Sequence, residues 1–527
     1  MKLLQKNLVK SYLVSLKQMD RKYLIVGLSL LFFLAFILRV LYLPRLALTF
    51  GYDQARDALV TQQILGGDLK ILGPPASTPG LYHGIFYNYL LAPAYLFGKG
   101  NPIAAAYWIA LLNALTVLLV YFLTYLLIRR VGVSLLASFL FAISFQATQY
   151  AVWLSDPTIG IWTVPIFYLG LWLWLKEAKR WGAILAGVGL GLTIQADISL
   201  AYHLVPLGFW LWVERRRIQR KSLFMFIAAF TLSVLTMILV EFKFNFKAIG
   251  GISYLLSSQD AHTKTKDIGD FIVLYLNQYG KTFTNSVLPS NPGFGGALGV
   301  IGLFWLMKSW YEEHRRKILS WQIFLATYLL AHLPIVSLGG FGTPFLTVGL
   351  GVASVILTSL ILAAIWKKNR YLAILLTLAI IISNISNITA QNKDGQTLFA
   401  IQKDMLLSKQ LQAVDYTYRE SKSEPFSINT FTSPLWVNTV WSYLYNWYGK
   451  AKFGYLPQWH GRDQIGQLGN NLAATSPSTK LYFFIIEPPQ GIPEQYLPLE
   501  IGSEDAKSTL LEEKNFGEIR VQKRIKK

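Results

Sequence analysis

Hydrophobic residues in this chain gather into long continuous blocks instead of scattering as they do in soluble cores. The blocks are about 20 residues long, which is enough for an α-helix to cross the ~30 Å hydrocarbon layer of a bilayer. They lie at residues 22–43, 103–127, 132–152, 158–175, 182–196, 199–213, 222–240, 293–310, 319–338, 344–366 and 371–389. The pattern predicts an α-helical integral membrane protein with about eleven transmembrane helices.

Basic clusters between the blocks predict how the chain is oriented. They precede the first block and then fall in alternate connecting segments, at residues 2–22, 129–130, 176–180, 215–221, 308–317 and 367–370. Segments on the cytoplasmic side of a membrane carry such an excess of positive charge. The N-terminus is therefore expected in the cytoplasm. Segments 44–102, 155–157 and 241–292 are expected outside as loops, together with Asp197, and the first of them is expected to contain interfacial helices.

Beyond residue 389 the chain turns polar and mixed in charge. Residues 425–431, 480–486 and 516–525 are rich in strand-forming residues, and residues 398–419 have the pattern of a helix. We therefore expect two parts: a multi-spanning membrane domain over residues 1–389 and a small extracytoplasmic α/β or α+β domain over residues 390–527.

The composition agrees with a membrane protein and argues against a nucleic-acid partner. Hydrophobic residues make up 53% of the chain and charged residues only 15%. The net charge of +21 is carried by short tracts that membrane orientation explains. No cysteine is present, which excludes disulfides and cysteine metal ligands. The first block is too long for a signal-peptide core, so we expect an uncleaved helix in the plasma (inner) membrane.

The first outer segment carries the charged residues best suited to chemistry. Residues 50–57 read Phe-Gly-Tyr-Asp-Gln-Ala-Arg-Asp and begin a helix that we expect to run to Leu65 and to end at residues 66–68, Gly-Gly-Asp. Asp53 and Asp57 are four residues apart and therefore share one face of that helix. Asp53 is either the N-cap of this helix or a reactive carboxylate.

Other outer residues also have both a structural and a chemical interpretation. His83 follows a Pro-rich stretch and Tyr82, and it precedes an aromatic run. It is either a packing residue at the membrane interface or a ligand. Asp156, which precedes Pro157, and Asp197 both fit the N-cap of a helix.

The joint order of these residues resembles the lipid-carrier-dependent glycosyltransferases of the GT-C class. The closest branch holds the protein O-mannosyltransferases and the bacterial lipid A aminoarabinose transferase. In that family the helix after the first span begins with Asp-Glu and ends in a Gly-Asp turn. Residues 53–56 (Asp-Gln-Ala-Arg) and 67–68 (Gly-Asp) match, except that Gln54 replaces the second acid. Residues 79–89 resemble the family's Pro-rich, aromatic stretch, and Asp156 resembles its aspartate before the fourth span. The likeness extends to about residue 240 and hardly includes the C-terminal domain.

The resemblance implies an inverting hexosyl- or pentosyltransferase that moves a sugar from a polyprenyl-phosphate carrier to an acceptor hydroxyl at the outer face. It implies that Asp53 is the general base, and that Asp156 orients the acceptor or joins a metal site. Arg56 is expected to bind the leaving phosphate, with His83 as second choice. Weaker candidates for the phosphate contact are Lys243, Lys247, Lys264 and Lys266 in the long outer segment. Further acceptor or loop contacts are expected from Asp57, Tyr82 and Lys264. Gln54 weakens the expectation of a divalent metal without removing it.

Other functions stay open at this point. A transporter or flippase for lipid-linked glycans would place ionisable residues inside the spans, where this sequence has few. A membrane anchor would leave the acidic loop without a role. The acceptor is a protein, a lipid or a polysaccharide. Aromatic residues of the C-terminal domain either bind sugar rings or form its core; they are Trp436, Trp441, Tyr443, Tyr445, Trp447, Tyr448 and Trp459.

Overall fold

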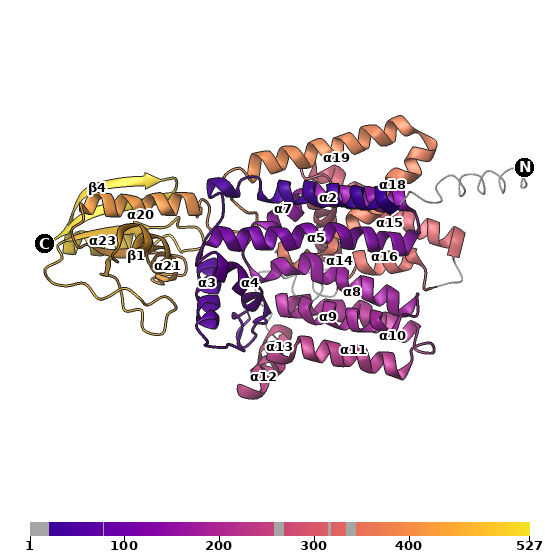
Figure 1. The fold of residues 1–527 in the computed structure, drawn as a ribbon, viewed down its shortest axis with the longest axis horizontal. Helices are drawn as coiled ribbons and strands as arrows, with labels where there is room; N and C mark the ends of the chain where they lie inside the picture. Colours follow the sequence, from indigo (N-terminus) through magenta and orange to yellow (C-terminus); the bar gives the residue numbers. More distant parts are fainter. Residues whose placement is uncertain (1–20, 77, 258–267, 315–317, 334–343) are drawn as a thin grey trace, which may run out of the picture.

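The protein is a bundle of helices with a small sheet at one end (Figure 1). The computed structural model describes residues 21–76, 78–257, 268–314, 318–333 and 344–527. The α-helices up to residue 391 are α2 (Arg21–Val40), α3 (Tyr52–Leu65), α4 (Phe86–Phe97), α5 (Pro102–Ile128), α6 (Val131–Ala142), α7 (Phe145–Ala151), α8 (Gly160–Leu175), α9 (Arg180–Ala196), α10 (Leu204–Val213), α11 (Arg220–Ser233), α12 (Leu235–Lys243), α13 (Lys247–Ser257), α14 (Ile268–Val287), α15 (Pro292–His314), α16 (Trp321–Leu329), α18 (Leu350–Lys368) and α19 (Arg370–Gln391). Short 3-10 helices are η1 (Leu43–Arg45), η2 (Asp156–Ile159), η3 (Ile198–His203) and η4 (Pro344–Thr347).

The chain is a multi-pass membrane protein, although eleven separate spans are not all present as long helices. Among the described residues, five helices are long and apolar enough to cross a membrane, and the number rises to as many as eight if each bent pair is one span. The bent pairs are α6 with α7 (56°), α11 with α12 (61°) and α14 with α15 (108°). The block at 199–213 forms η3 and α10, and the block at 319–338 contributes only the short α16 before it leaves the described residues. The count of eleven stays a prediction.

The segment at 241–292 is not the loop that we predicted. Its described residues fold into α13 and α14, and α14 packs against α15 and α18. Tyr279, Phe283 and Val287 of α14 are buried, whereas Ile272 and Leu276 are exposed. Polar residues interrupt the apolar run of this segment, so it has helical periodicity without the continuous hydrophobicity of the other blocks.

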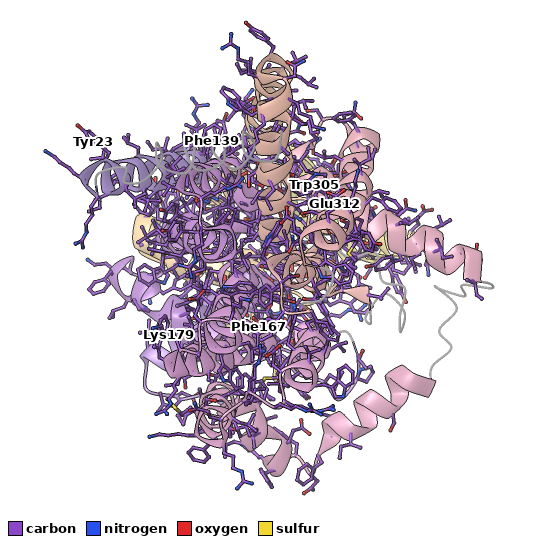
Figure 2. The ribbon with its side chains drawn as sticks, turned by 90° about the vertical axis from the view of Figure 1, so that its right-hand side faces the viewer. Tyr23, Phe139, Phe167, Lys179, Trp305 and Glu312 are labelled. Atoms are coloured by element: carbon purple, nitrogen blue, oxygen red, sulfur yellow. The ribbon has the colours of Figure 1, made fainter. Side chains whose placement is uncertain are left out.

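The turns that carry the basic clusters lie together at one end of the bundle. The connections α5–α6, α8–α9, α10–α11 and α18–α19 are at the end away from the C-terminal sheet (Figure 1). Arg129 and Glu177 form an ion pair that joins the first two of these turns. Seen from that end, Lys179 lies toward the edge of the bundle and Phe167 lies among the helices (Figure 2). The connections that carry these four basic clusters therefore lie at one end of the helices.

A buried arginine in α2 helps to hold the break between α6 and α7. Arg39 is 2% exposed and donates to Asn113 Oδ1 at 2.7 Å and to the carbonyl of Ala142 at 3.0 Å. The last carbonyls of α6 have no partner within the helix, so a cation satisfies both their hydrogen bonds and their partial negative charge. This cation in a span therefore has a structural role.

The C-terminal part is a mixed five-stranded sheet packed against helices. Its strands are β1 (Ser427–Phe431), β2 (Gln458–Trp459), β3 (Leu481–Ile486), β4 (Ser508–Phe516) and β5 (Ile519–Lys526), in the order β2-β1-β3-β5-β4. Its helices are α20 (Leu407–Ser421), α21 (Thr439–Leu444), the π-helical turn η5 (Tyr445–Gly449), α22 (Lys450–Phe453) and α23 (Tyr496–Lys507). β1 pairs in parallel with β2 and β3, whereas β5 runs antiparallel to β3 and β4. The three predicted strands are present as β1, β3 and β5. The helix predicted over residues 398–419 is present as α20, but it begins at Leu407, nine residues later than predicted. Strand β4 was missed because its side chains are mostly exposed.

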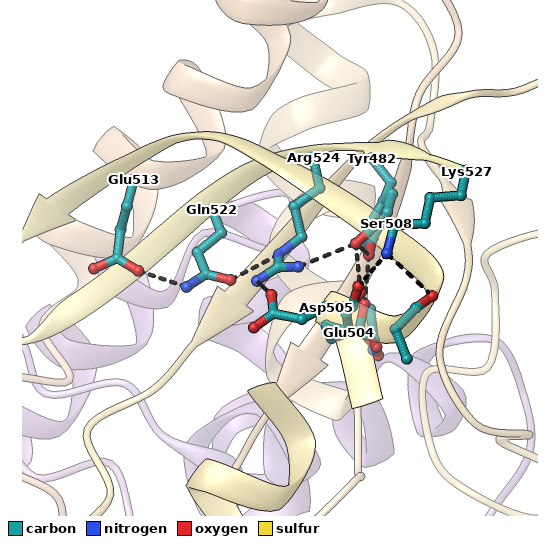
Figure 3. Close-up of polar contacts among 10 residues, drawn as sticks. Tyr482, Glu504, Asp505, Ser508, Glu513, Gln522, Arg524 and Lys527 are labelled. Atoms are coloured by element: carbon teal, nitrogen blue, oxygen red, sulfur yellow. Dashed lines mark hydrogen bonds and ion pairs between the residues drawn. The ribbon is translucent and has the colours of Figure 1, made fainter. Parts of the chain in front are cut away.

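A polar network closes the β4–β5 hairpin against α23 (Figure 3). Arg524 is fully buried and donates to Gln522, Ser508 and Asp505 at 2.7–3.0 Å. The Tyr482 hydroxyl donates to the buried Glu504 at 2.6 Å. Every charge in this layer has a partner, so the network specifies the packing of α23 on the sheet.

The C-terminal part is joined directly to the segment that precedes α3. Leu407 N–H donates to the carbonyl of Leu48 at 2.8 Å, and Phe50 N–H donates to the carbonyl of Met405 at 2.9 Å. The Gln410 amide donates to the carbonyl of Phe50 at 2.7 Å. Trp441, Tyr443 and Tyr445, which were predicted either as core or as a sugar platform, are at most 1% exposed and belong to the core.

Candidate active site

Helix α3 presents the first group of charged residues. Gly51 is its N-cap, and the backbone N–H of Gly51 donates to Gln54 Oε1 at 2.9 Å. The helix ends at Gly66, and Gly67 follows with a φ of 94°, a conformation that favours glycine. The predicted ends of this helix are therefore confirmed. Asp53 is not its N-cap but lies in its first turn, where the helix dipole favours a carboxylate.

Arg56 is held between two carboxylates of the same helix. Its Nη1 lies 2.7 Å from Asp53 Oδ1, and its Nε and Nη2 both lie 3.0 Å from Asp57 Oδ1. The Asp53 side chain is 57% exposed, whereas those of Arg56 and Asp57 are 12% and 2% exposed. Asp53 is therefore open to a substrate, and Asp57 fixes the guanidinium from the buried side.

Burial changes the proton affinity of Asp57. Desolvation raises the pKa of its carboxyl to about 6, against the lowering effect of Arg56 and with a further rise from Asp53. Asp57 Oδ2 is buried and has no hydrogen-bond partner among the described residues. Asp57 is thus the buried partner of Arg56 and is shielded from an incoming acceptor.

His83 stands between two aspartates from other elements. Its Nδ1 lies 3.6 Å from Asp197 Oδ1 and 4.0 Å from Asp156 Oδ2. Asp156 is the first residue of η2, directly after its N-cap Ser155, and opens the span Asp156–Leu175. Asp197 caps η3, as predicted, by accepting from Ser199 N–H at 2.8 Å. Residues from three distant parts of the sequence therefore meet at one point.

A close backbone approach brings His83 to this position. Gly84 N–H donates to the carbonyl of Gln195 in the last turn of α9 at 2.9 Å. A Cβ at Gly84 would lie 2.8 Å from Gln195 Cα, so only glycine permits the contact. The backbone N–H of Ile198 donates to His83 Nδ1 at 3.3 Å. The proton of the neutral imidazole is then on Nε2, which remains a donor for a ligand.

An apolar cavity of about 220 Å³ adjoins His83. Tyr82 and His83 line it together with residues of α9, η3, α11, α12 and α13; these include Ile194, Ile198, Phe230, Met237, Glu241 and Ala248. Val234, at the 61° bend between α11 and α12, is part of the cavity wall. The cavity suits a hydrocarbon chain whose polar end faces the histidine.

Comparisons with known proteins identify the fold. No family model matches the sequence, and no curated protein matches it. The structure is similar to that of ArnT from Cupriavidus metallidurans bound to undecaprenyl phosphate. The TM-score is 0.59 at 9% identity, over 95% of this chain and 98% of that chain. The chain has the GT-C fold of ArnT.

Two further solved structures are similar over smaller parts. One is the archaeal oligosaccharyltransferase AglB from Archaeoglobus fulgidus, in complex with an inhibitory peptide and a dolichol-phosphate. Its TM-score is 0.47 at 15% identity, over 79% of this chain and 63% of that chain. The other is the arabinofuranosyltransferase AftD from Mycobacteria, with a TM-score of 0.39 at 14% identity, over 85% of this chain and 32% of that chain. The likeness to ArnT confirms, for the fold, the resemblance read from the sequence.

Within this ArnT-type fold, two residues near the carboxylates escaped the sequence analysis as site candidates. The sequence favoured a capping role for Asp197, yet its Oδ1 also lies 3.6 Å from His83 Nδ1. The hydroxyl of Tyr87 on α4 is buried without a hydrogen-bond partner among the described residues. Burial raises the pKa of Tyr87 well above its usual value, and the charges of Asp57 and Asp156 add to this. The hydroxyl therefore stays protonated. Tyr87 belongs to an aromatic run, so the sequence alone could not separate it from its neighbours.

The lysines predicted as further contacts do not join the α3 group in the described part of the chain. Lys243 and Lys247 lie 5.8 Å and 5.9 Å from the Phe244 ring and make no ion pair with the α3 carboxylates. Lys264 and Lys266 lie outside the described residues. In the described part of the chain, no group of three or more His, Cys, Asp or Glu side chains is arranged to hold a metal ion.

Proposed function

We propose that this protein transfers a sugar from a polyprenyl-phosphate carrier to an acceptor hydroxyl, with inversion at the anomeric carbon. The ArnT-type fold supports a membrane protein built like a glycosyltransferase but carries no chemistry by itself. Three observations carry the proposal. Asp53 and Arg56 form an ion pair on α3, and His83 lines the apolar cavity. The charge of Asp156 interacts with both His83 and Arg56, so the two groups belong to one polar region.

The donor is expected to bind with its lipid in the cavity and its phosphate toward the cationic and N–H groups. The guanidinium of Arg56 can grip two phosphate oxygens at once. Arg56 stays positively charged. Burial lowers its pKa, but the charges of Asp57, Asp53 and Asp156 outweigh this and raise the pKa above its usual value. His83 Nε2 supplies a second donor. Both groups stabilise the charge that develops on the phosphate as it leaves.

Asp53 is the proposed general base. The acceptor oxygen forms a bond to the anomeric carbon while the bond from that carbon to the phosphate oxygen breaks. The hydroxyl proton passes to Asp53. The electron pair of the broken bond stays on the phosphate oxygen, and polyprenyl phosphate departs as the leaving group. Asp53 is the exposed carboxylate of the pair, so an acceptor can reach it. Asp156 is proposed to orient the acceptor.

We place this reaction on the outer face of the plasma (inner) membrane. The support is the segregation of basic turns to the end of the bundle opposite α3 and the C-terminal sheet (Figure 1). The C-terminal part, proposed as residues 390–527, is then extracytoplasmic. The acceptor is a protein, a lipid or a polysaccharide of that compartment.

Donor turnover by the purified protein tests this function. A radiolabelled hexose and a radiolabelled pentose, each on polyprenyl phosphate, are incubated with the protein and a cell-envelope extract. We expect free polyprenyl phosphate to appear together with labelled acceptor. A protein that moves the intact donor across a proteoliposome bilayer without cleaving it would instead be a flippase for lipid-linked glycans.

A further inference from the structure

Gln54 occupies the position at which the sequence departs from the Asp-Glu pair of the resembling family. Its side chain is 6% exposed in the first turn of α3. Oε1 accepts from the N–H of Gly51 at 2.9 Å, and Nε2 donates to the carbonyl of Leu154 at 3.1 Å. One amide therefore joins two segments that are 100 residues apart in the sequence.

These two contacts fix the orientation of the amide. A backbone N–H needs an acceptor and a backbone carbonyl needs a donor, so only one of the two amide orientations satisfies both. Leu154 is 1% exposed and lies in the irregular stretch between α7 and η2. A buried carbonyl without a donor costs about 1–3 kcal/mol. The bond from Gln54 is therefore important for the conformation of this stretch.

The stretch held by Gln54 leads directly into Asp156. Leu154 precedes Ser155, whose hydroxyl donates to Asp156 Oδ1 at 3.2 Å. At the other end, Gln54 is the neighbour of Asp53. We infer that Gln54 is a positioning residue that fixes the Asp53 carboxylate relative to Asp156. This inference rests on the proposed function.

The same geometry explains why an amide suits this position better than the acid of the family pattern. Ionised glutamate would keep the acceptor for Gly51 but would have no N–H for the Leu154 carbonyl. Its oxygen would instead face the carbonyl oxygen, and the two would repel each other. The charged groups around position 54 are Asp53, Arg56 and Asp57 on α3 and Asp156 beyond Leu154.

Gln54→Glu removes the hydrogen bond to the carbonyl of Leu154 and keeps the one from the N–H of Gly51. At pH 8 we expect kcat to fall between about 10- and 100-fold, because small misplacements of reacting groups have effects of this size. The KM for the donor should stay within about twofold, because Arg56 and His83 are untouched. Near pH 5.5 the protonated side chain of Gln54→Glu regains a donor for Leu154. Its kcat should then recover toward that of the wild-type protein at the same pH, in which Asp57 titrates as well.

Two control variants separate this effect from general damage. Gln54→Met removes both bonds and should be slow at both pH values. Gln63→Glu adds the same charge to an exposed site of α3 and should match wild type. A wild-type kcat for Gln54→Glu at pH 8, or a loss that does not recover at low pH, would overturn the inference.

Hydrogen exchange gives a readout that does not depend on the donor. At pH 8, Gln54→Glu should speed exchange of the backbone amides of residues 152–156 but not of the C-terminal sheet. Unchanged exchange in this stretch would also overturn the inference. Absence of transfer by the wild-type protein would instead count against the proposed function alone.

Discussion

Arg56 shows how a single side chain is prepared for a phosphate. Its guanidinium is held by Asp57 from the buried side and by Asp53 at the exposed edge. This arrangement removes most of its rotamer freedom before a ligand arrives, so little entropy is lost on binding. A point charge at the same place would lack the planar fork that fits two oxygens.

Arg56→Lys is therefore expected to weaken donor binding even though the charge is retained. Lysine cannot contact both aspartates and two phosphate oxygens in this geometry. We expect the Kd for a short-chain polyprenyl-phosphate sugar to rise at least about tenfold, measured by calorimetry on the detergent-solubilised protein. Lys243→Arg serves as the control, because Lys243 lies on α12 and forms no ion pair with Asp53 or Asp57. Equal donor affinity in both variants would move the phosphate site toward His83.

The sequence could predict which residues are candidates for the site, but not which of them contact one another in the folded protein. Asp53, Arg56 and Asp57 lie on one helix, so spacing alone brings them together. His83, Asp156 and Asp197 converge only because Gly84 docks on the end of α9. That contact depends on tertiary packing and leaves no periodic signal in the sequence. The same is true of the contact between Gln54 and Leu154.

At the scale of elements, the segment before α3 is held by the C-terminal part. Thr49 Oγ donates to the carbonyl of Gly395 at 2.7 Å, and Thr49 pairs with Leu406 in an isolated antiparallel bridge. Phe50 packs on Tyr443 with ring centroids 5.5 Å apart. A shift of this segment would move the first turn of α3 with it.

A pair of glycines tests this dependence. Gly395 and Gly454 both have a positive φ, 87° and 86°, so alanine at either site costs about 1–2 kcal/mol in backbone strain. A Cβ at Gly395 would lie 2.1 Å from the carbonyl carbon of Ala47, whereas Gly454 has nothing within 4 Å. We expect Gly395→Ala to lower the thermal unfolding temperature and donor turnover further than Gly454→Ala. Equal unfolding temperatures and equal turnover for the two variants would show that the segment before α3 accommodates the added methyl group without loss of stability or activity.

Helices and strands whose hydrophobic residues recur at one clear spacing could be predicted, whereas elements with a less regular pattern could not. Helix α3 was predicted with its ends because glycines mark its C-terminus and a charged first turn marks its start. Strands β1, β3 and β5 are buried or half-buried and therefore read clearly. Helix α14 falls in the segment predicted as a loop. Its buried and exposed residues lie on different faces, so the sequence shows no continuous hydrophobic block there.

At the scale of the whole molecule, the bundle has two unlike ends. One end carries the basic turns, and the other carries α3, α4 and the C-terminal sheet (Figure 1). If positive charge marks the cytoplasm, Asp53, Arg56 and the other candidate site residues near α3 lie outside. The chain has no cysteine, so single cysteines report their compartment without interference.

Cysteine labelling tests the orientation. Ser478 in the C-terminal part and Arg216 in the α10–α11 turn are both exposed. In intact cells, Ser478→Cys should react with an impermeant maleimide, and Arg216→Cys should react only after the membrane is opened. The reverse pattern would place the site on the cytoplasmic face and would contradict the proposed location.

The central claim is that Asp53 removes the proton of the acceptor, and turnover of Asp53→Asn tests it most directly. Asn keeps the size of the side chain and removes only its basicity. Asp57→Asn is unsuitable as a comparison, because Asp57 is buried and holds Arg56. Asp68 is the better control, since its side chain is 61% exposed, close to the 57% of Asp53, and it also pairs with a cation.

Both variants are purified and compared at equal monodispersity, with release of polyprenyl phosphate as the readout. We expect Asp53→Asn to fold and bind donor while its turnover falls by roughly 10²–10⁴-fold, the usual contribution of a positioned base. Asp68→Asn should turn over donor at the wild-type rate. Wild-type turnover by Asp53→Asn would contradict the account.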